Sequence, residues 1–313
     1  MAVNFVKDKD PHIVKIEKKS TPLEKKAPLV ATAVSLFLAI IKLFFGIVSG
    51  SVALLASAVD SIMDMFVSVF NFLAIRLSDR SPDDKFPFGY GKVEALAAAF
   101  EGLVVTVSGF YIIYEGVVKI IRNEPVEKVG SSIAVMIISI ITVGFLVWFL
   151  SYVHRKTGNM VIKADLLHYK TDLFSNSAVL LSLGIIYFTD WFWIDAFFGI
   201  AIGIYIVKEA FELIREGVFV LLDASLPEEE VSEIENIIKE DERVSDFHFL
   251  KTRQAGKVKF VEVHIVLNPD ISLLDAHKIG DDIEERIKKI DKEYIWHVLI
   301  HLDPYDDSQM HDV

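Results

Sequence analysis

Two pairs of ionisable side chains lie inside long apolar stretches of the sequence. Asp60 and Asp64 are four residues apart in ALLASAVDSIMDMFVSVFNFLAI, and His168 and Asp172 have the same spacing in ADLLHYKTDLFSNSAVLLSLGIIYF. On a helix this spacing brings two side chains to the same face. A carboxylate at the centre of a membrane helix costs about 2.5 to 3.5 kcal/mol on insertion scales, so these groups need a compensating partner. A divalent cation would supply it.

The donor types narrow the choice of metal. One imidazole with three carboxylates suits tetrahedral Zn²⁺, and the imidazole argues against Mg²⁺ and Ca²⁺, which prefer oxygen ligands. Cd²⁺, Fe²⁺, Mn²⁺ and Co²⁺ remain candidates. The chain has no cysteine, which excludes thiolate ligands and disulfides. The alternative is a structural role in which polar residues join helices and Lys42 neutralises one aspartate, but one lysine does not balance three carboxylates.

Apolar stretches make up most of the first 222 residues. Hydrophobic residues form 52% of the sequence and the mean hydropathy is +0.42, both high for a soluble protein. About 20 apolar residues span the hydrocarbon core of a bilayer. The sequence therefore predicts six membrane-spanning helices, at residues 28–49, 52–77, 94–121, 131–153, 164–188 and 191–221.

Lysine and arginine are concentrated at alternate ends of these predicted helices. Residues 1–27 hold seven lysines and the connections after the second and fourth helices are basic, whereas the first and fifth connections carry no lysine or arginine. Because positive residues mark the cytoplasmic side, we expect a multi-pass protein of the inner cell membrane with both termini in the cytoplasm. The second helix then runs inward and the fifth outward, so that both polar pairs can meet at one depth.

Residues 223–313 differ sharply in composition from the preceding part. They hold 23 acidic and 11 basic side chains, so the whole formal net charge of −12 resides there. This charge argues against nucleic acid as a partner and is compatible with cationic partners or with solubility alone. A helix start at Pro227, a hairpin around Ala-Gly, an amphipathic helix and a final strand predict an αββαβ domain of the α+β class. The predicted division is a cytoplasmic tail at 1–27, a membrane domain at 28–222 and a cytoplasmic domain at 223–313.

Five segments resemble the cation diffusion facilitator family, in particular its zinc-type members. They are SVALLASAVDSIMD, DDKFPFGYGKVEALAA, ADLLHYKTD, HFLKTRQAG and LIHLDP. The resemblance implies a homodimeric exporter, not an enzyme, that moves a divalent metal outward in exchange for protons across the lipid bilayer. It also implies a metallochaperone-like regulatory and dimerisation domain at the C-terminal end. Carried over, the transport site consists of Asp60, Asp64, His168 and Asp172.

The same resemblance assigns further residues outside the predicted spans. In the tail, the positions that match the family's cytoplasmic metal ligands are His248, His264, His277, His301 and Asp303. Independently of the match, His297, His301 and Asp303 alternate with apolar residues along the last predicted strand, so they share one face. Lys92 and Asp223 match a charge pair that joins the dimer to the membrane domain.

One loop departs from the family pattern. Zinc-type relatives often carry a second site after the second helix, with an aspartate and two histidines. Here the aspartate matches Asp83, but Phe86 and Tyr90 occupy the histidine positions. Neither side chain binds zinc well. We therefore expect the loop site to be weak or absent and Asp83 to be a solvated loop charge.

Two function classes follow from these patterns. In the first, the four intramembrane ligands alternately face the two sides of the membrane, and metal and protons compete for them. In the second, the protein is a membrane-anchored divalent-metal sensor or binding protein through which nothing crosses. A sensor needs no ligands at bilayer depth, which favours the transporter.

Overall fold

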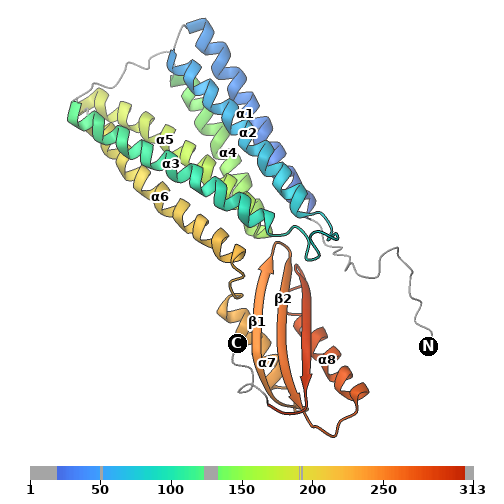
Figure 1. Ribbon diagram of the computed structural model, residues 1–313. Coiled ribbons are helices and arrows are strands. Elements are labelled where there is room, and N and C mark those ends of the chain that lie inside the picture. Colours follow the sequence, from blue (N-terminus) through green and yellow to red (C-terminus); the bar gives the residue numbers. More distant parts are fainter. Residues whose placement is uncertain (1–19, 50–51, 123–132, 190, 192, 307–313) are drawn as a thin grey trace. The chain divides into compact units, whose positions relative to one another are not determined.

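The computed structural model describes residues 20–49, 52–122, 133–189, 191 and 193–306 (Figure 1). The chain divides into two compact units. A helical unit combines Ser20–Leu77 with Val93–Val218, and a sheet-bearing unit combines Ser78–Lys92 with the chain from Phe219 onward. Each unit is therefore assembled from segments that are distant in the sequence.

The helical unit is built from six long helices. They are α1 (Pro22–Ser49), α2 (Val52–Ser78), α3 (Val93–Arg122), α4 (Ile133–Thr157), α5 (Met160–Thr189) and α6 (Trp193–Leu221). Among the described residues, four stretches are long and apolar enough to cross a membrane: Pro22–Val48, Ser57–Ser78, Val93–Arg122 and Ile133–Thr157. The prediction of six spans is thus supported for α1 to α4. The two remaining helices, α5 and α6, are not among these four stretches, and both carry several charged side chains along their length.

Two helices begin earlier than the hydrophobic pattern predicts. The first starts at Pro22 rather than residue 28, because Thr21 and Glu24 form a capping box in which each backbone N–H is bound by the other side chain. The fifth starts at Met160 rather than residue 164. Asn159 caps it by accepting the Val161 N–H at 3.0 Å.

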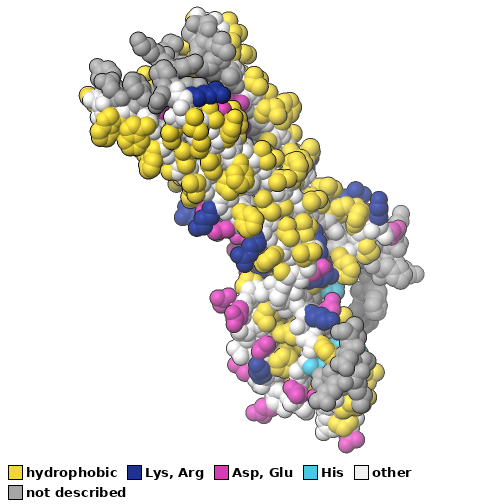
Figure 2. Space-filling view, turned by 60° about the vertical axis from the view of Figure 1, so that its left-hand side comes forward, with side chains coloured by type: hydrophobic (Ala, Val, Ile, Leu, Met, Phe, Trp, Pro, Cys, Tyr) yellow, Lys and Arg dark blue, Asp and Glu magenta, His cyan; other side chains and the backbone are white. Residues whose placement is uncertain are grey.

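Small residues allow α3 and α6 to approach closely. Gly102, Gly109 and Gly116 recur every seven residues along α3, and a Cβ at any of them would come within 2.8 Å of an isoleucine or valine side chain of α6. Such close backbone approach is typical of helix packing in membranes, where hydrophobic burial does not drive association. Large apolar side chains instead cover the outside of this unit, whereas charged side chains gather on the sheet-bearing unit (Figure 2).

The sheet-bearing unit contains α7 (Glu228–Lys239), β1 (Val244–Ala255), β2 (Val258–Leu267), α8 (Leu273–Ile287) and β3 (Ile295–Asp303), in the predicted αββαβ order. The strands lie in the order β1-β2-β3, with β1 antiparallel and β3 parallel to β2. Both helices cover one face of the sheet (Figure 1). Alternate residues of β2 and β3, including Val261, Ile265 and Trp296, pack against them. The other residues of these strands face away from the helices.

Candidate metal centres

The helical unit brings three of the four predicted transport ligands together. Nε2 of His168 lies 3.0 Å from Oδ1 of Asp64 and 3.9 Å from Oδ2 of Asp172. One ligand atom from each residue lies within 4.8 Å of the other two. The side chains of His168 and Asp64 are only 17% and 19% exposed. One nitrogen and two oxygen donors at this spacing match three corners of a tetrahedral zinc site.

Asp60 lies outside this group. It precedes Asp64 by four residues on α2, on the same face of the helix, but its side chain is exposed. Three protein ligands leave one coordination position for Asp60, water or another donor. The assignment of all four residues as metal ligands therefore stays a prediction.

A lysine from α1 contributes positive charge next to these carboxylates. Lys42 is buried, and its Nζ donates to Oγ of Ser61 at 2.8 Å. It interacts electrostatically with Asp64, Asp172 and Asp60. One ammonium does not balance the carboxylates of Asp60, Asp64 and Asp172, and the remaining formal negative charge would attract cations.

Polar residues that the sequence analysis missed extend the group along α2 and α5. Ser68 donates from Oγ to Oδ1 of Asp165 at 3.5 Å and lies 2.8 Å from the Tyr169 hydroxyl. Asn71 donates to Oε2 of Glu101 at 3.0 Å. The spacing of Asp64, Ser68 and Asn71, four and then three residues, is a helical periodicity that could have revealed this polar face.

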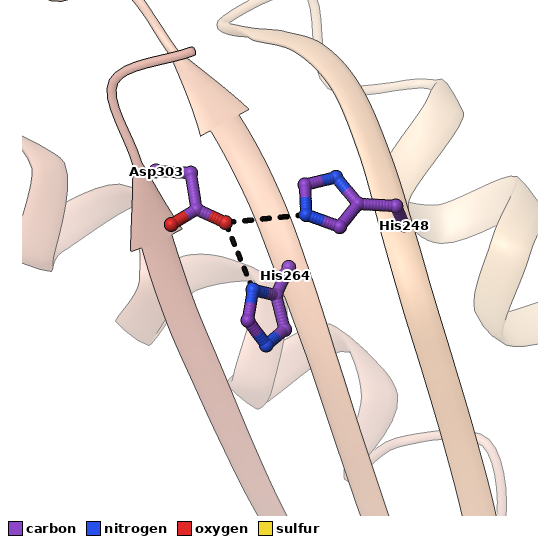
Figure 3. Close-up of side chains that lie close together, drawn as sticks. All are labelled: His248, His264 and Asp303. Atoms are coloured by element: carbon purple, nitrogen blue, oxygen red, sulfur yellow. Dashed lines mark hydrogen bonds and ion pairs between the residues drawn. The ribbon is translucent and has the colours of Figure 1, made fainter. Parts of the chain in front are cut away.

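The sheet-bearing unit holds a second group, which Figure 3 shows. Oδ2 of Asp303 lies 2.9 Å from Nδ1 of His264 and 3.4 Å from Nε2 of His248. The strand register explains this cluster, because His248 pairs with His264 and His264 pairs with His301 on adjacent strands. Asp303 is 6% exposed at the end of β3. A break in the β1 register just after His248, with Phe249 at φ 52°, distorts the strand edge beside the cluster.

The other tail histidines differ in position. Nε2 of His301 lies 3.0 Å from Oδ1 of Asp303, at the rim of the cluster, and its side chain is 63% exposed. His277 lies on α8, is exposed, and pairs with Asp281 at 3.7 Å. His297 stacks on Phe260, with ring centroids 5.5 Å apart. The described chain therefore groups four of the five predicted tail ligands and leaves His277 outside.

Comparison with known proteins matches both units of this chain. Residues 29–222 match the cation efflux transmembrane domain, and residues 226–305 match the cytoplasmic domain of cation efflux proteins. The cation-efflux pump FieF of Klebsiella pneumoniae is 35% identical over 282 residues, which cover 90% of this chain and 93% of the pump. The chain belongs to the cation diffusion facilitator family. It is thus a multi-pass membrane transporter for cation efflux rather than an enzyme, with a C-terminal cytoplasmic domain.

Other relatives of this cation diffusion facilitator include FieF of Escherichia coli strain K12 / DH10B, which is 36% identical over 282 residues. A solved structure of the metal-bound C-terminal domain of the CzcD transporter from Thermotoga maritima is 25% identical. The matched region covers 24% of this chain and 87% of the solved chain, with a TM-score of 0.23.

In this family member the loop between α2 and α3 uses Asp83 as a structural group. Its Oδ1 accepts the N–H of Phe86 at 2.9 Å, and its Oδ2 accepts the Tyr90 hydroxyl at 2.7 Å. The bond from Tyr90 is the main cause that lowers the pKa of Asp83 below its usual value. Asp83 is therefore engaged in holding the loop, which is more than the solvated charge expected from the sequence.

The predicted charge pair also lies within the sheet-bearing unit. Nζ of Lys92 lies 2.9 Å from Oδ1 of Asp223, and Arg253 reaches the same oxygen at 3.3 Å. Partial burial raises the pKa of Asp223, but the hydrogen bonds from Lys92 and Arg253 outweigh it and hold the pKa below its usual value. Asp223 has φ 58°, a left-handed conformation that aspartate tolerates better than most residues. Asp223 lies just after α6, and its ion pairs with Lys92 and Arg253 hold the chain in place where the tail domain begins.

Proposed function

We propose that this cation diffusion facilitator exports a divalent metal, with Zn²⁺ as the preferred substrate, in exchange for protons. The observation that carries the proposal is the convergence of Asp64, His168 and Asp172 from two helices of an apolar helical unit. A nitrogen donor with carboxylates favours Zn²⁺, whereas Cd²⁺, Fe²⁺, Mn²⁺ and Co²⁺ are the alternative substrates.

The exchange follows from the chemistry of the ligands. Imidazole and carboxylate bind metal in their deprotonated forms, so metal and protons exclude one another from the same atoms. Metal collected from the cytoplasmic side is displaced when protons enter from outside, and the protons leave on the inner side. Alternating access of α2 and α5 to the two sides supplies the movement, with Asp60 as the fourth ligand when metal is bound.

The membrane arrangement that supports this proposal has six crossings, with α5 and α6 as the fifth and sixth. Asp165 of α5 and Asp195 of α6 then face the interior of the helical unit, where both are buried. The N-terminal tail at 1–27, the membrane domain at 28–222 and the tail domain at 223–313 form the three functional parts. Both termini lie in the cytoplasm, and the membrane is the inner cell membrane.

The tail domain is proposed to regulate transport through metal and dimerisation. Two imidazoles and a carboxylate, with His301 beside the second Asp303 oxygen, fit Zn²⁺. Cytoplasmic metal bound there would favour the homodimer that is competent for transport. The Lys92 to Asp223 pair, which lies within the sheet-bearing unit, is proposed to help hold this homodimer. Charge reversal in Lys92→Glu should reduce transport, and unchanged transport would remove the proposed role of the pair.

Proteoliposomes test the transport site. Asp64→Asn and Asp172→Asn remove a charged ligand with little change in volume, so zinc-driven proton flux should fall at least tenfold while the protein elutes as wild type does. Ser108→Ala on α3 is a control, because the Ser108 hydroxyl donates to the Val104 carbonyl of its own helix. Flux that persists in both aspartate variants overturns the assignment. Zinc binding without flux in the wild type would favour the sensor alternative.

A further inference from the structure

A group of buried oxygen atoms lies between α2, α3 and α5, next to the proposed transport site. Asn71 is fully buried, Glu101 is 3% exposed and Asp165 is 1% exposed. The Asn71 amide donates to Oε2 of Glu101 at 3.0 Å, and the Ser68 hydroxyl donates to Oδ1 of Asp165 at 3.5 Å. Two carboxylates from different helices are thus held by polar side chains of α2.

Three oxygens of this group lack hydrogen-bond donors. Among the described residues, Oε1 of Glu101, Oδ2 of Asp165 and Oδ1 of Asn71 have no partner. A buried polar atom without a partner costs about 1 to 3 kcal/mol, and more when it is charged. Natural proteins rarely leave three such acceptors in one cluster, so a positively charged occupant is expected there.

The position of the group relates it to the transport ligands. Asp165 precedes His168 by three residues on α5, and Asn71 follows Asp64 by seven residues on α2, which are about 4.5 and 10 Å along the helix axes. The cross-helix pairs Asp64 with His168 and Ser68 with Asp165 show that both displacements run the same way. The oxygens therefore lie beyond the transport ligands in a single direction, toward the end of α2 and the start of α5.

We propose that Asn71, Glu101 and Asp165 form a second cation site, built only from oxygen, that binds a divalent metal. Two carboxylates and an amide oxygen are ligands that suit hard cations, and Mn²⁺ is the member of the candidate substrates that accepts them best. This inference rests on the proposed function in one respect, because it takes the bound metal to be substrate on its way to or from His168. The Ser68 hydroxyl, which touches Asp165 and Tyr169, lies between the two sites.

The experiment counts Mn²⁺ bound to the full chain in detergent, by the loss of the free-ion signal in electron paramagnetic resonance. The background variant is Asp64→Asn with Asp172→Asn, which disables the proposed transport ligands and keeps the group of His248, His264 and Asp303. Adding Glu101→Gln and Asp165→Asn should remove one further equivalent of Mn²⁺ per chain. The same number of equivalents in both proteins would overturn the second site and indicate that a proton satisfies the oxygens.

A matched control is Asp195→Asn in the same background. Asp195 is also a buried carboxylate, but Ser182 and Lys119 already bond its two oxygens, at 2.7 and 2.9 Å. This variant should bind the same number of Mn²⁺ equivalents per chain as the background variant. If the double variant does not fold, Asp165→Asn alone should weaken Mn²⁺ binding at the site at least tenfold, and unchanged binding would again overturn the proposal.

Zinc flux by the wild type in sealed vesicles separates this inference from the proposed function. If the wild type transports zinc but Glu101→Gln with Asp165→Asn removes no Mn²⁺ equivalent, only the second site is overturned. If these substitutions remove a Mn²⁺ equivalent but the wild type transports no zinc, the transport proposal is overturned and the second site is retained.

Discussion

Nε2 of His168 lies 3.0 Å from Oδ1 of Asp64, although 104 residues separate them in the sequence. The contact joins α5 to α2 and supplies the only nitrogen donor of the three-residue group in the helical unit. In the proposed transport site, the choice of metal therefore depends on one imidazole.

Replacing this imidazole should change selectivity. His168→Asp exchanges nitrogen for a harder oxygen donor, so transport should shift from Zn²⁺ toward Mn²⁺ by about tenfold in the ratio of rates. Competition between the two metals in proteoliposomes measures this ratio. An unchanged preference for zinc would contradict the role given to His168.

Removing the nearby ammonium should tighten metal binding. Lys42→Met takes away a positive charge that repels an incoming cation, so the dissociation constant for Zn²⁺ should fall about tenfold, or about 1.4 kcal/mol. Calorimetric titration in the presence of an intact tail domain provides the measurement. Lys119→Met is the matched control, because Lys119 pairs with Asp195 instead. Equal affinity in Lys42→Met and wild type would exclude electrostatic control by Lys42.

Restoring the histidines should create the missing loop site. Asp83 already accepts bonds from Phe86 and Tyr90, so Phe86→His together with Tyr90→His removes a competing hydroxyl and adds two imidazoles near the carboxylate. The double variant should bind one more equivalent of Zn²⁺ per chain than the wild type in equilibrium dialysis. Tyr90→Phe alone should add none, and an extra equivalent in that control would point to a different site.

The tail domain should lose stability in acid through Asp241. Hydrogen bonds from Arg243 lower the pKa of this carboxyl, whose oxygens lie 2.7 to 2.8 Å from the guanidinium nitrogens. A lowered folded-state pKa stabilises the fold above the unfolded pKa of about 3.9 and stops doing so as pH falls through the folded value. Asp241→Asn should therefore melt below wild type at pH 7, and the two melting temperatures should converge below pH 4. A difference that stays constant over this range would contradict the linkage.

Periodicity predicted the element order of the tail domain and the faces of β3, because apolar residues recur at every second position of that strand. As expected, Trp296, Val298, Ile300 and Leu302 pack against the helices, which leaves His301 and Asp303 on the opposite face. The hydrophobic pattern places the starts of α1 and α5 too late, because each helix begins at a polar cap before its first apolar residues. Thr21 with Glu24 and Asn159 are ordinary cap signals within polar segments.

The second layer of polar residues was harder to predict. Glu101 lies between apolar residues of α3 in the sequence, and only tertiary packing brings it to Asn71. Likewise, the sequence places Asp60 and Asp64 on one face, but the position of α5 determines that Asp64 contacts His168 while Asp60 stays exposed. Spacing along one helix indicates candidates, whereas the partner helix decides which of them meet.

The central claim is that metal crosses the membrane in exchange for protons. Wild-type protein in sealed vesicles that contain both a zinc-sensitive and a pH-sensitive dye measures the two ions at once. When zinc is added outside, the internal zinc signal should rise, and the internal pH should also rise because protons leave in exchange. Asp64→Asn should abolish both changes. Zinc that binds to the vesicles without entering, or that enters with no change in internal pH, would contradict this account.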